Sequence, residues 1–167
     1  MPETSDFSDL LAANRAFAAE FDFGGFDGIA RAGVAIVTCM DSRIEPLGML
    51  GLQPGDAKIL RNPGGRVDHS ALEALVLGVH LLQVDRILVV PHTRCAVASS
   101  TVAEIHDAVA ASAGDVGSWQ PMHIVEDQLA ALRDDVASVR AHPLIGADVQ
   151  VGGFLYDVDS GLMTQHC

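Results

Sequence analysis

Hydrophobic residues along the chain follow two spacings, one typical of amphipathic helices and the other of buried strands. In four segments apolar residues recur every three or four positions, as at Leu75, Val79 and Leu82. These predicted helices are residues 6–21, 69–83, 97–111 and 122–140. Short apolar runs rich in β-branched residues predict strands at residues 33–38, 57–61, 86–90 and 149–158. Strands that alternate with helices are typical of an α/β domain, so we predict a central, mainly parallel sheet of about four strands flanked by helices.

The first helical segment differs from the others because a glycine-rich break, FGGFDG at 23–28, separates it from the first strand. Its apolar stripe includes Phe7, Leu10 and Phe17, which is more apolar surface than a helix surrounded only by water requires. The chain has 167 residues, with no interior linker and no internal repeat. We therefore expect a single domain, 1–167, in which residues 1–25 form an N-terminal helical arm.

The charge and composition exclude several classes of partner. The chain carries a net charge of −12 and its pI is about 4.7, whereas nucleic acids and anionic membrane surfaces attract basic proteins. No apolar segment reaches the roughly 18 residues of a membrane span, and the acidic N-terminus lacks the basic and apolar parts of a signal peptide. We expect no nucleic-acid or membrane partner and a cytoplasmic location.

The three cysteines, Cys39, Cys95 and Cys167, are odd in number and widely spaced. In a reducing compartment this pattern favours metal binding, catalysis or simple burial over a disulfide framework. Cys167 ends the sequence, and we expect it to be free and disordered.

The other two cysteines stand near predicted strand ends. Cys39 follows the first strand, and the motif HTRC, which contains His92 and Cys95, follows the third. The carboxyl ends of parallel strands form the usual ligand-binding edge of an open sheet, so these side chains meet there if the two strands are neighbours. Two thiolates and one imidazole suit a catalytic zinc site that keeps its fourth position open, and sulfur favours zinc over magnesium or calcium. Each residue alone also has a structural explanation, such as a small buried side chain for Cys39, but the joint pattern favours zinc.

Asp41 and Arg43 follow Cys39 in the motif CMDSR. Asp41 is suited to accept a hydrogen bond from a hydroxide on the metal and to orient it, while Arg43 holds the carboxylate ionised through a bidentate pair. Asp41 has an alternative role as a fourth zinc ligand, which would close the site. An Asp-x-Arg pair is also common on surfaces, where it contributes little.

The segment NPGGR at 62–66 is glycine-rich. It lacks the spacing of a phosphate-binding loop, so nucleotide binding is not expected. We predict a tight turn packed beneath the metal site.

Three blocks of the sequence resemble the signatures of the β-class carbonic anhydrases in their short bacterial form. These blocks are CMDSR (39–43), ILRNPGG (59–65) and HTRC (92–95). Other similar segments extend the resemblance over roughly residues 5–163, almost the whole chain. The combination of CxDxR and HxxC in this order is specific.

The resemblance implies that Cys39, His92 and Cys95 bind one Zn²⁺ per chain, and that Asp41 and Arg43 form the catalytic dyad. It also implies that a zinc-bound hydroxide hydrates CO₂ to bicarbonate and a proton. Members of the family form homodimers or larger homo-oligomers. By this resemblance we expect the N-terminal arm to pack on a partner subunit.

The sequence departs from the family pattern around the site. Ala96 stands where the family usually has glycine, and Arg94 stands where an aspartate, glycine or another small residue is common. Pro63 and Pro91 are also unusual at their positions. These departures keep two alternatives open. One is hydrolysis of COS or CS₂, linear isosteres of CO₂ that some family members cleave. The other is a catalytically weak zinc-containing relative that binds a small anion.

Overall fold

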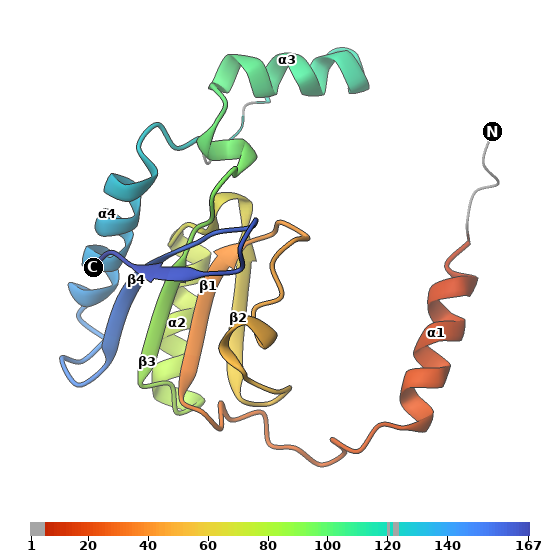
Figure 1. Ribbon diagram of the computed structural model, residues 1–167, viewed down its shortest axis with the longest axis vertical. Coiled ribbons are helices and arrows are strands. Elements are labelled where there is room, and N and C mark those ends of the chain that lie inside the picture. The colour runs from red at the N-terminus through yellow and green to blue at the C-terminus, as the bar shows by residue number, and fades with distance from the viewer. Residues whose placement is uncertain (1–5, 120, 122–123) are drawn as a thin grey trace.

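A computed structural model describes residues 6–119, 121 and 124–167 (Figure 1). The α-helices are α1 (Ser8–Ala19), α2 (His69–Leu81), α3 (Val102–Ala113) and α4 (Gln128–Arg140). The strands are β1 (Val34–Cys39), β2 (Ala57–Asn62), β3 (Arg86–Val90), β4 (Gln150–Tyr156) and β5 (Met163–Gln165). Three short 3₁₀ turns are η1 (Gly48–Leu50), η2 (Pro63–Gly65) and η3 (Ala96–Ala98).

The strands form one sheet in the order β2-β1-β3-β4-β5. The first four are parallel to their neighbours, and β5 pairs antiparallel with β4. This confirms the predicted α/β fold with a mainly parallel sheet. The fifth strand was not predicted, because its three residues are too few to show a spacing.

Strand β1 lies inside the sheet, between β2 and β3. All six of its residues are buried, as its continuous apolar run requires of a strand covered on both faces. The chain leaves β1 toward β2 on one side and returns to β3 on the other, so the order reverses at β1. Ligands of open α/β sheets bind at such a switch point, outside the carboxyl ends of the strands.

Helices α2 and α4 cover one face of the sheet (Figure 1). Leu75 of α2 and Val136 of α4 belong to one buried cluster with Val37 and Val89 of the sheet. A second cluster, which includes Ile36, covers the other face beneath loops. The two clusters hold β1 and β3 rigidly, and the chain that follows these two strands carries the candidate site.

Two helices begin later than their apolar patterns predict, and hydrogen bonds at their first turns explain both starts. Thr101 caps α3 in a reciprocal box with Glu104, so the helix begins at Val102 and not at 97. Asp127 accepts hydrogen bonds from the N–H groups of Leu129 and Ala130, and α4 begins at Gln128. The prediction began this helix at 122, and residues 122 and 123 lie outside the described residues. Such side chains satisfy donors that a helix end leaves open, and so they decide its first residue.

Helix α1 stands apart from the sheet (Figure 1). None of its residues is buried, and the side chains of Phe7, Leu10 and Phe17 are each more than 60% exposed. Helix α3 also projects from the body and buries none of its residues. Among the described residues, no helix is long and apolar enough to cross a membrane.

The expectation of a disordered Cys167 is wrong. Its backbone carbonyl accepts a hydrogen bond from the N–H of Gly153, at 2.8 Å. Its side chain is half-buried and packs against the cluster under α4. Gly153 leaves the space that the sulfur fills, because a Cβ at that position would lie 2.6 Å from the sulfur.

Candidate metal centre

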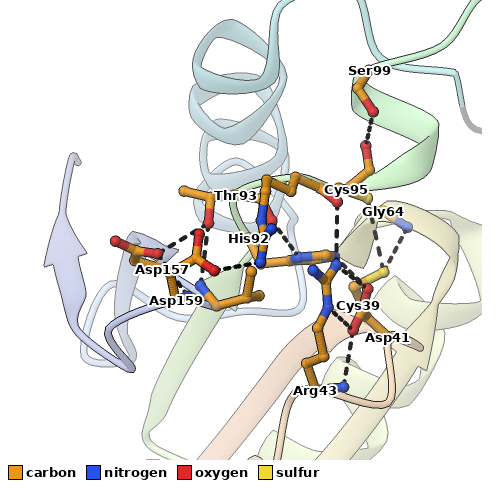
Figure 2. Close-up of polar contacts among 12 residues, drawn as sticks. Cys39, Asp41, Arg43, Gly64, His92, Thr93, Cys95, Ser99, Asp157 and Asp159 are labelled. Atoms are coloured by element: carbon orange, nitrogen blue, oxygen red, sulfur yellow. Dashed lines mark hydrogen bonds and ion pairs between the residues drawn. The ribbon is translucent and has the colours of Figure 1, made fainter.

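The structure brings Cys39, His92 and Cys95 together (Figure 2). Cys39 is the last residue of β1, and the other two lie in the loop that follows β3. Because β1 and β3 are hydrogen-bonded neighbours, with Thr38 opposite Val90, the two segments leave the sheet side by side. All three side chains are buried, and their donor atoms lie within 4.8 Å of one another.

The spacing of these donors fits a zinc ion. The sulfur atoms of Cys39 and Cys95 are 4.0 Å apart. Two sulfurs on one tetrahedral zinc, each about 2.3 Å from the metal, would lie roughly 3.8 Å apart. Small side-chain adjustments are enough to close this difference.

His92 gives independent support for a metal. Its Nδ1 lies 2.9 Å from the carbonyl oxygen of Thr93, and a carbonyl only accepts, so Nδ1 carries the hydrogen. Its Nε2 is then a free lone-pair donor. This atom is buried and has no hydrogen-bond partner among the residues that the structure describes, which is a costly state for a polar group. A metal ion on Nε2 would remove that cost, and the second ring nitrogen already has the carbonyl partner typical of a metal-binding histidine.

The Cys39 and Cys95 side chains affect each other's ionisation, because their sulfur atoms are within hydrogen-bonding distance. Their mutual hydrogen bond lowers the pKa of Cys39 and raises the pKa of Cys95, whose thiol is further disfavoured from ionising by burial. The N–H of Gly64 also points at the Cys39 sulfur, at 3.3 Å. Metal binding requires both thiolates, so it must displace the remaining proton.

Asp41 and Arg43 form a close pair beside the donors (Figure 2). The Arg43 side chain donates from Nε to Oδ1 at 2.9 Å and from Nη2 to Oδ2 at 2.7 Å. These bonds hold the pKa of the Asp41 carboxyl well below its usual range. Oδ2 of Asp41 also lies 3.8 Å from Nε2 of His92. The carboxylate therefore stands next to the donor set and stays ionised, so it can only accept hydrogen bonds.

The turn η2 lies against the end of β1, as the sequence predicts for NPGGR. Gly65 has a φ of +67°, and a Cβ there would lie 2.9 Å from the backbone nitrogen of Cys39. Only glycine allows this close approach. Pro63 occupies the first position of the turn, where a missing N–H costs nothing.

The sequence did not single out Arg61 or Gln128, yet both contact the segments that carry the donors. Arg61 donates to the carbonyl oxygens of Cys39, at 2.9 Å, and Asp41, at 2.6 Å. Gln128 at the start of α4 donates to the carbonyl oxygen of His92 at 3.0 Å. A polar residue at the end of a strand and another at the start of a helix give no periodic signal, so only the fold reveals these contacts.

The comparisons with known proteins agree with the geometry. A family model described as carbonic anhydrase matches residues 34–123, just over half of the chain. The crystal structure of a carbonic anhydrase from Streptococcus mutans superposes with a TM-score of 0.85 at 34% identity, over 97% of this chain and 98% of that one. The chain belongs to the β-class carbonic anhydrase family. Members of this family are zinc lyases, and the Cys–His–Cys group is a fitting place for the metal.

Two relatives of this β-class carbonic anhydrase chain are named for different activities. The chain is 27% identical to "Beta-carbonic anhydrase 1" of Mycobacterium tuberculosis over 157 residues, which cover 94% of this chain and 95% of the relative. It is 29% identical to a "Carbon disulfide hydrolase" of Acidianus over 150 residues, which cover 75% and 72%. The family therefore includes relatives named for two different activities, carbonic anhydrase and carbon disulfide hydrolase.

Arg94, one of the departures from the family pattern, directly precedes Cys95. Its φ of +54° falls in the left-handed region that favours glycine. Its carbonyl oxygen accepts a hydrogen bond from Nη2 of Arg43 at 3.2 Å, and its side chain forms an ion pair with Asp159. The main chain of Arg94 therefore supports the dyad, while its side chain reaches an exposed partner.

We expect Arg94→Gly to keep both activity and metal content. The substitution keeps the carbonyl that accepts from Arg43. It relieves left-handed strain of about 1 kcal/mol and removes an exposed ion pair that contributes about 0–1 kcal/mol. The free energy of unfolding should change by less than about 1 kcal/mol, as denaturant titration would measure. Asp159→Ala removes the ion pair alone and serves as the control; a tenfold loss of activity in Arg94→Gly but not in Asp159→Ala would contradict this account.

Proposed function

We propose that the protein catalyses the reversible hydration of CO₂ to bicarbonate and a proton. One observation carries this proposal: an ionised Asp41, fixed by Arg43, lies 3.8 Å from the free Nε2 of a buried Cys–His–Cys donor set. The three donors would be Cys39, His92 and Cys95, with one zinc ion per chain. Zinc, when bound, supplies a hydroxide nucleophile near neutral pH.

In this proposal Asp41 orients the nucleophile. Oδ1 accepts from both the Nε and the backbone N–H of Arg43, whereas Oδ2 accepts from Nη2 and keeps a second lone pair. A carboxylate that only accepts hydrogen bonds takes the O–H of the attacking oxygen and directs the lone pair of that oxygen at the substrate carbon. Arg43 keeps the carboxylate in one rotamer and ionised, and the proton released by the reaction leaves to solvent.

The alternative role of Asp41, as a fourth zinc ligand, needs a different arrangement. Arg43 engages both oxygens of the carboxylate and also reaches the carbonyl of Arg94. A bond from Asp41 to the metal would compete with these hydrogen bonds for the carboxylate oxygens. The arrangement with the pair intact is the one that suits catalysis.

The test compares CO₂ with its sulfur isosteres on zinc-loaded protein. We expect stopped-flow assays to show CO₂ hydration well above the uncatalysed rate, and no sulfide release from CS₂ or COS above a protein-free control. Faster turnover of CS₂ would assign the activity named for the Acidianus relative instead. A CO₂ rate no greater than that of a variant without the Cys39 thiol would leave the catalytically weak, anion-binding alternative.

We also propose that residues 1–25, of which 1–5 lie outside the described residues, form an arm that packs on a second copy of the chain, giving a homodimer or a larger homo-oligomer around one domain, 1–167. The support is the exposed apolar face of α1, whose flanking and internal residues Phe7, Leu10, Leu11 and Phe17 are 56–75% exposed. Such a stripe is unfavourable in water and favours burial in an interface.

Leu10→Asp should weaken this assembly by more than about 100-fold in Kd. Burial of one leucine contributes about 1.5–3 kcal/mol, and a dimer buries two copies. Ala12→Asp is the matched control, since positions two residues apart lie about 160° apart around a helix. Analytical ultracentrifugation over a dilution series measures both. A wild-type monomer at all concentrations, or equal weakening by both variants, would contradict the proposed role of the arm.

A cytoplasmic location is consistent with the chemistry of the site. Cys39 and Cys95 are free thiols whose sulfurs lie 4.0 Å apart. A reducing compartment keeps such a pair available for metal binding.

A further inference from the structure

Asp135 is a buried acid that the proposed mechanism does not use. It lies on the inner face of α4 with only 5% of its surface exposed. Its carboxylate accepts hydrogen bonds from Nε and Nη2 of Arg66, at 2.7 and 3.0 Å, and from the backbone N–H of Val67, at 3.2 Å. Burial of an acid is costly unless it is fully paired, so this carboxylate forms a specific anchor for the segment that contains Arg66.

That segment is the end of the η2 turn. Arg66 follows Gly65 directly, and Asn62 closes the turn from its other end. The Asn62 side chain accepts from the N–H of Arg66 at 2.8 Å and donates to its carbonyl at 2.7 Å. Hydrogen bonds between Asn62 and Arg66 thus close the turn at its base, and the Arg66–Asp135 pair attaches it to α4.

The anchored turn presents one group to the metal centre. Gly64, near its apex, donates its N–H to the Cys39 sulfur at 3.3 Å. The next residue, Gly65, touches the backbone of β1 so closely that no Cβ fits. A small shift of the turn would therefore either clash with β1 or withdraw the N–H from the sulfur.

We propose that Asp135 is a positioning residue for the metal centre, which acts through Arg66 to hold the Gly64 N–H on the Cys39 sulfur. The inference rests on the zinc site proposed above. Two thiolates donate much charge to a zinc ion, which makes it a weaker Lewis acid. A hydrogen bond to sulfur withdraws part of that charge, as partners of metal ligands commonly do. Asp135 would thus tune both the affinity for the metal and the electron density that Cys39 gives to it.

Helix α4 also reaches the second donor segment. Gln128 lies seven residues before Asp135, two turns along the helix, and binds the carbonyl of His92. A small pocket between α4 and the donor segments is lined by Gly64, Arg66, Pro91, Gln128 and Asp135, among others. Helix α4 therefore contacts the segments on both sides of the metal centre. Gln128 contacts the segment of His92, and Asp135 contacts, through Arg66, the turn beside Cys39.

The test measures metal binding and the sulfur–metal bond, without use of activity. Asp135→Asn keeps the shape but places an amide against the Arg66 guanidinium. We expect this variant to lower zinc affinity about 10–100-fold, as measured by competition with a chromophoric chelator. In the Co²⁺-substituted protein the sulfur-to-cobalt charge-transfer band should move to longer wavelength, because a sulfur without its hydrogen bond gives up an electron more easily.

Asp134→Asn is the matched control. Asp134 is the exposed neighbour of Asp135 on α4, so this variant removes the same charge and none of the anchoring bonds. It should keep wild-type affinity and an unchanged band. If Asp135→Asn does not fold, the double variant Arg66→Met with Asp135→Leu replaces the pair by apolar side chains of similar size, a change that proteins often tolerate. It should show the same loss of affinity and the same band shift.

The outcomes separate three explanations. A folded Asp135→Asn or double variant with wild-type zinc affinity and an unmoved band overturns the proposal, even if its melting temperature falls, because Asp135 would then be structural only. Equal effects of Asp134→Asn and Asp135→Asn overturn it as well, since charge alone would explain them. If the wild-type protein binds neither Zn²⁺ nor Co²⁺, the zinc site itself is wrong, and the inference fails with it.

Discussion

Replacement of Cys39 by serine should remove zinc and CO₂ hydration together. Cys39 is buried at the end of β1, and its sulfur is one of three donors within 4.8 Å of one another. A serine hydroxyl does not ionise near neutral pH and is a poor zinc ligand. Loss of a partner behind a ligand costs about 10–100-fold in metal affinity, and loss of the ligand itself should cost more. Metal analysis should find far less than one zinc per chain, and the hydration rate should fall to the uncatalysed level.

Cys167→Ser is the control for this prediction. Cys167 is the third cysteine of the chain and lies outside the donor set. The variant makes the same atomic change, and it should keep one zinc per chain and the wild-type rate. Full activity of Cys39→Ser at wild-type zinc content would contradict the proposed donor set. Equal losses in both variants would point to a general effect of thiol removal.

Asp41→Asn should have the opposite combination of effects: zinc is retained and activity is lost. The carboxylate pairs with Arg43 and is not needed to complete the donor set. An amide of the same shape can present its N–H₂ group to the nucleophile, so it no longer accepts reliably from the attacking oxygen. Loss of one positioned hydrogen-bonding group in an active site costs about 10²–10³ in kcat, and we expect a loss in this range.

Stopped-flow hydration assays and metal analysis on the same preparations measure both quantities. Asp159→Asn is the control, since it removes a nearby carboxylate that contacts Arg94 and not the donors. Its rate should stay within a few-fold of wild type. If Asp41→Asn turned over CO₂ at the wild-type rate, Asp41 would not orient the nucleophile. If it lost its zinc, Asp41 would be a ligand and not a member of a dyad.

The pH dependence of Asp41 follows from the direction of its pKa shift. Arg43 holds this pKa below its usual value, so the group is ionised at all pH values above the unfolded pKa. The stability that comes from the pair is therefore fully present near neutral pH. It is lost progressively as the pH falls from the unfolded pKa of the carboxyl through the lowered value.

The sequence by itself determined the fold class and the pieces of the candidate site. The continuous apolar run of β1 predicted a strand buried on both faces. The apolar stripes of α2 and α4 predicted that these helices pack against a sheet. Because the carboxyl ends of parallel strands lie at one edge of a sheet, the sequence predicted that CMDSR and HTRC meet if their strands are neighbours, and the structure pairs these strands. These predictions depend on spacing along a few consecutive residues, which a single sequence displays directly.

Only the tertiary structure decided which residues support that site. Asp135 and Arg66 are 69 positions apart, and Gln128 reaches the carbonyl of His92 from 36 positions away. The sequence contains one signal, an acid at Asp135 within the apolar stripe of a helix. A buried acid requires a polar partner, but the sequence does not show which residue that is. Likewise, a left-handed arginine at 94 and a three-residue β5 leave no periodic trace. Local spacing reports which face of an element is buried, whereas the partner of a buried polar group depends on how distant elements pack.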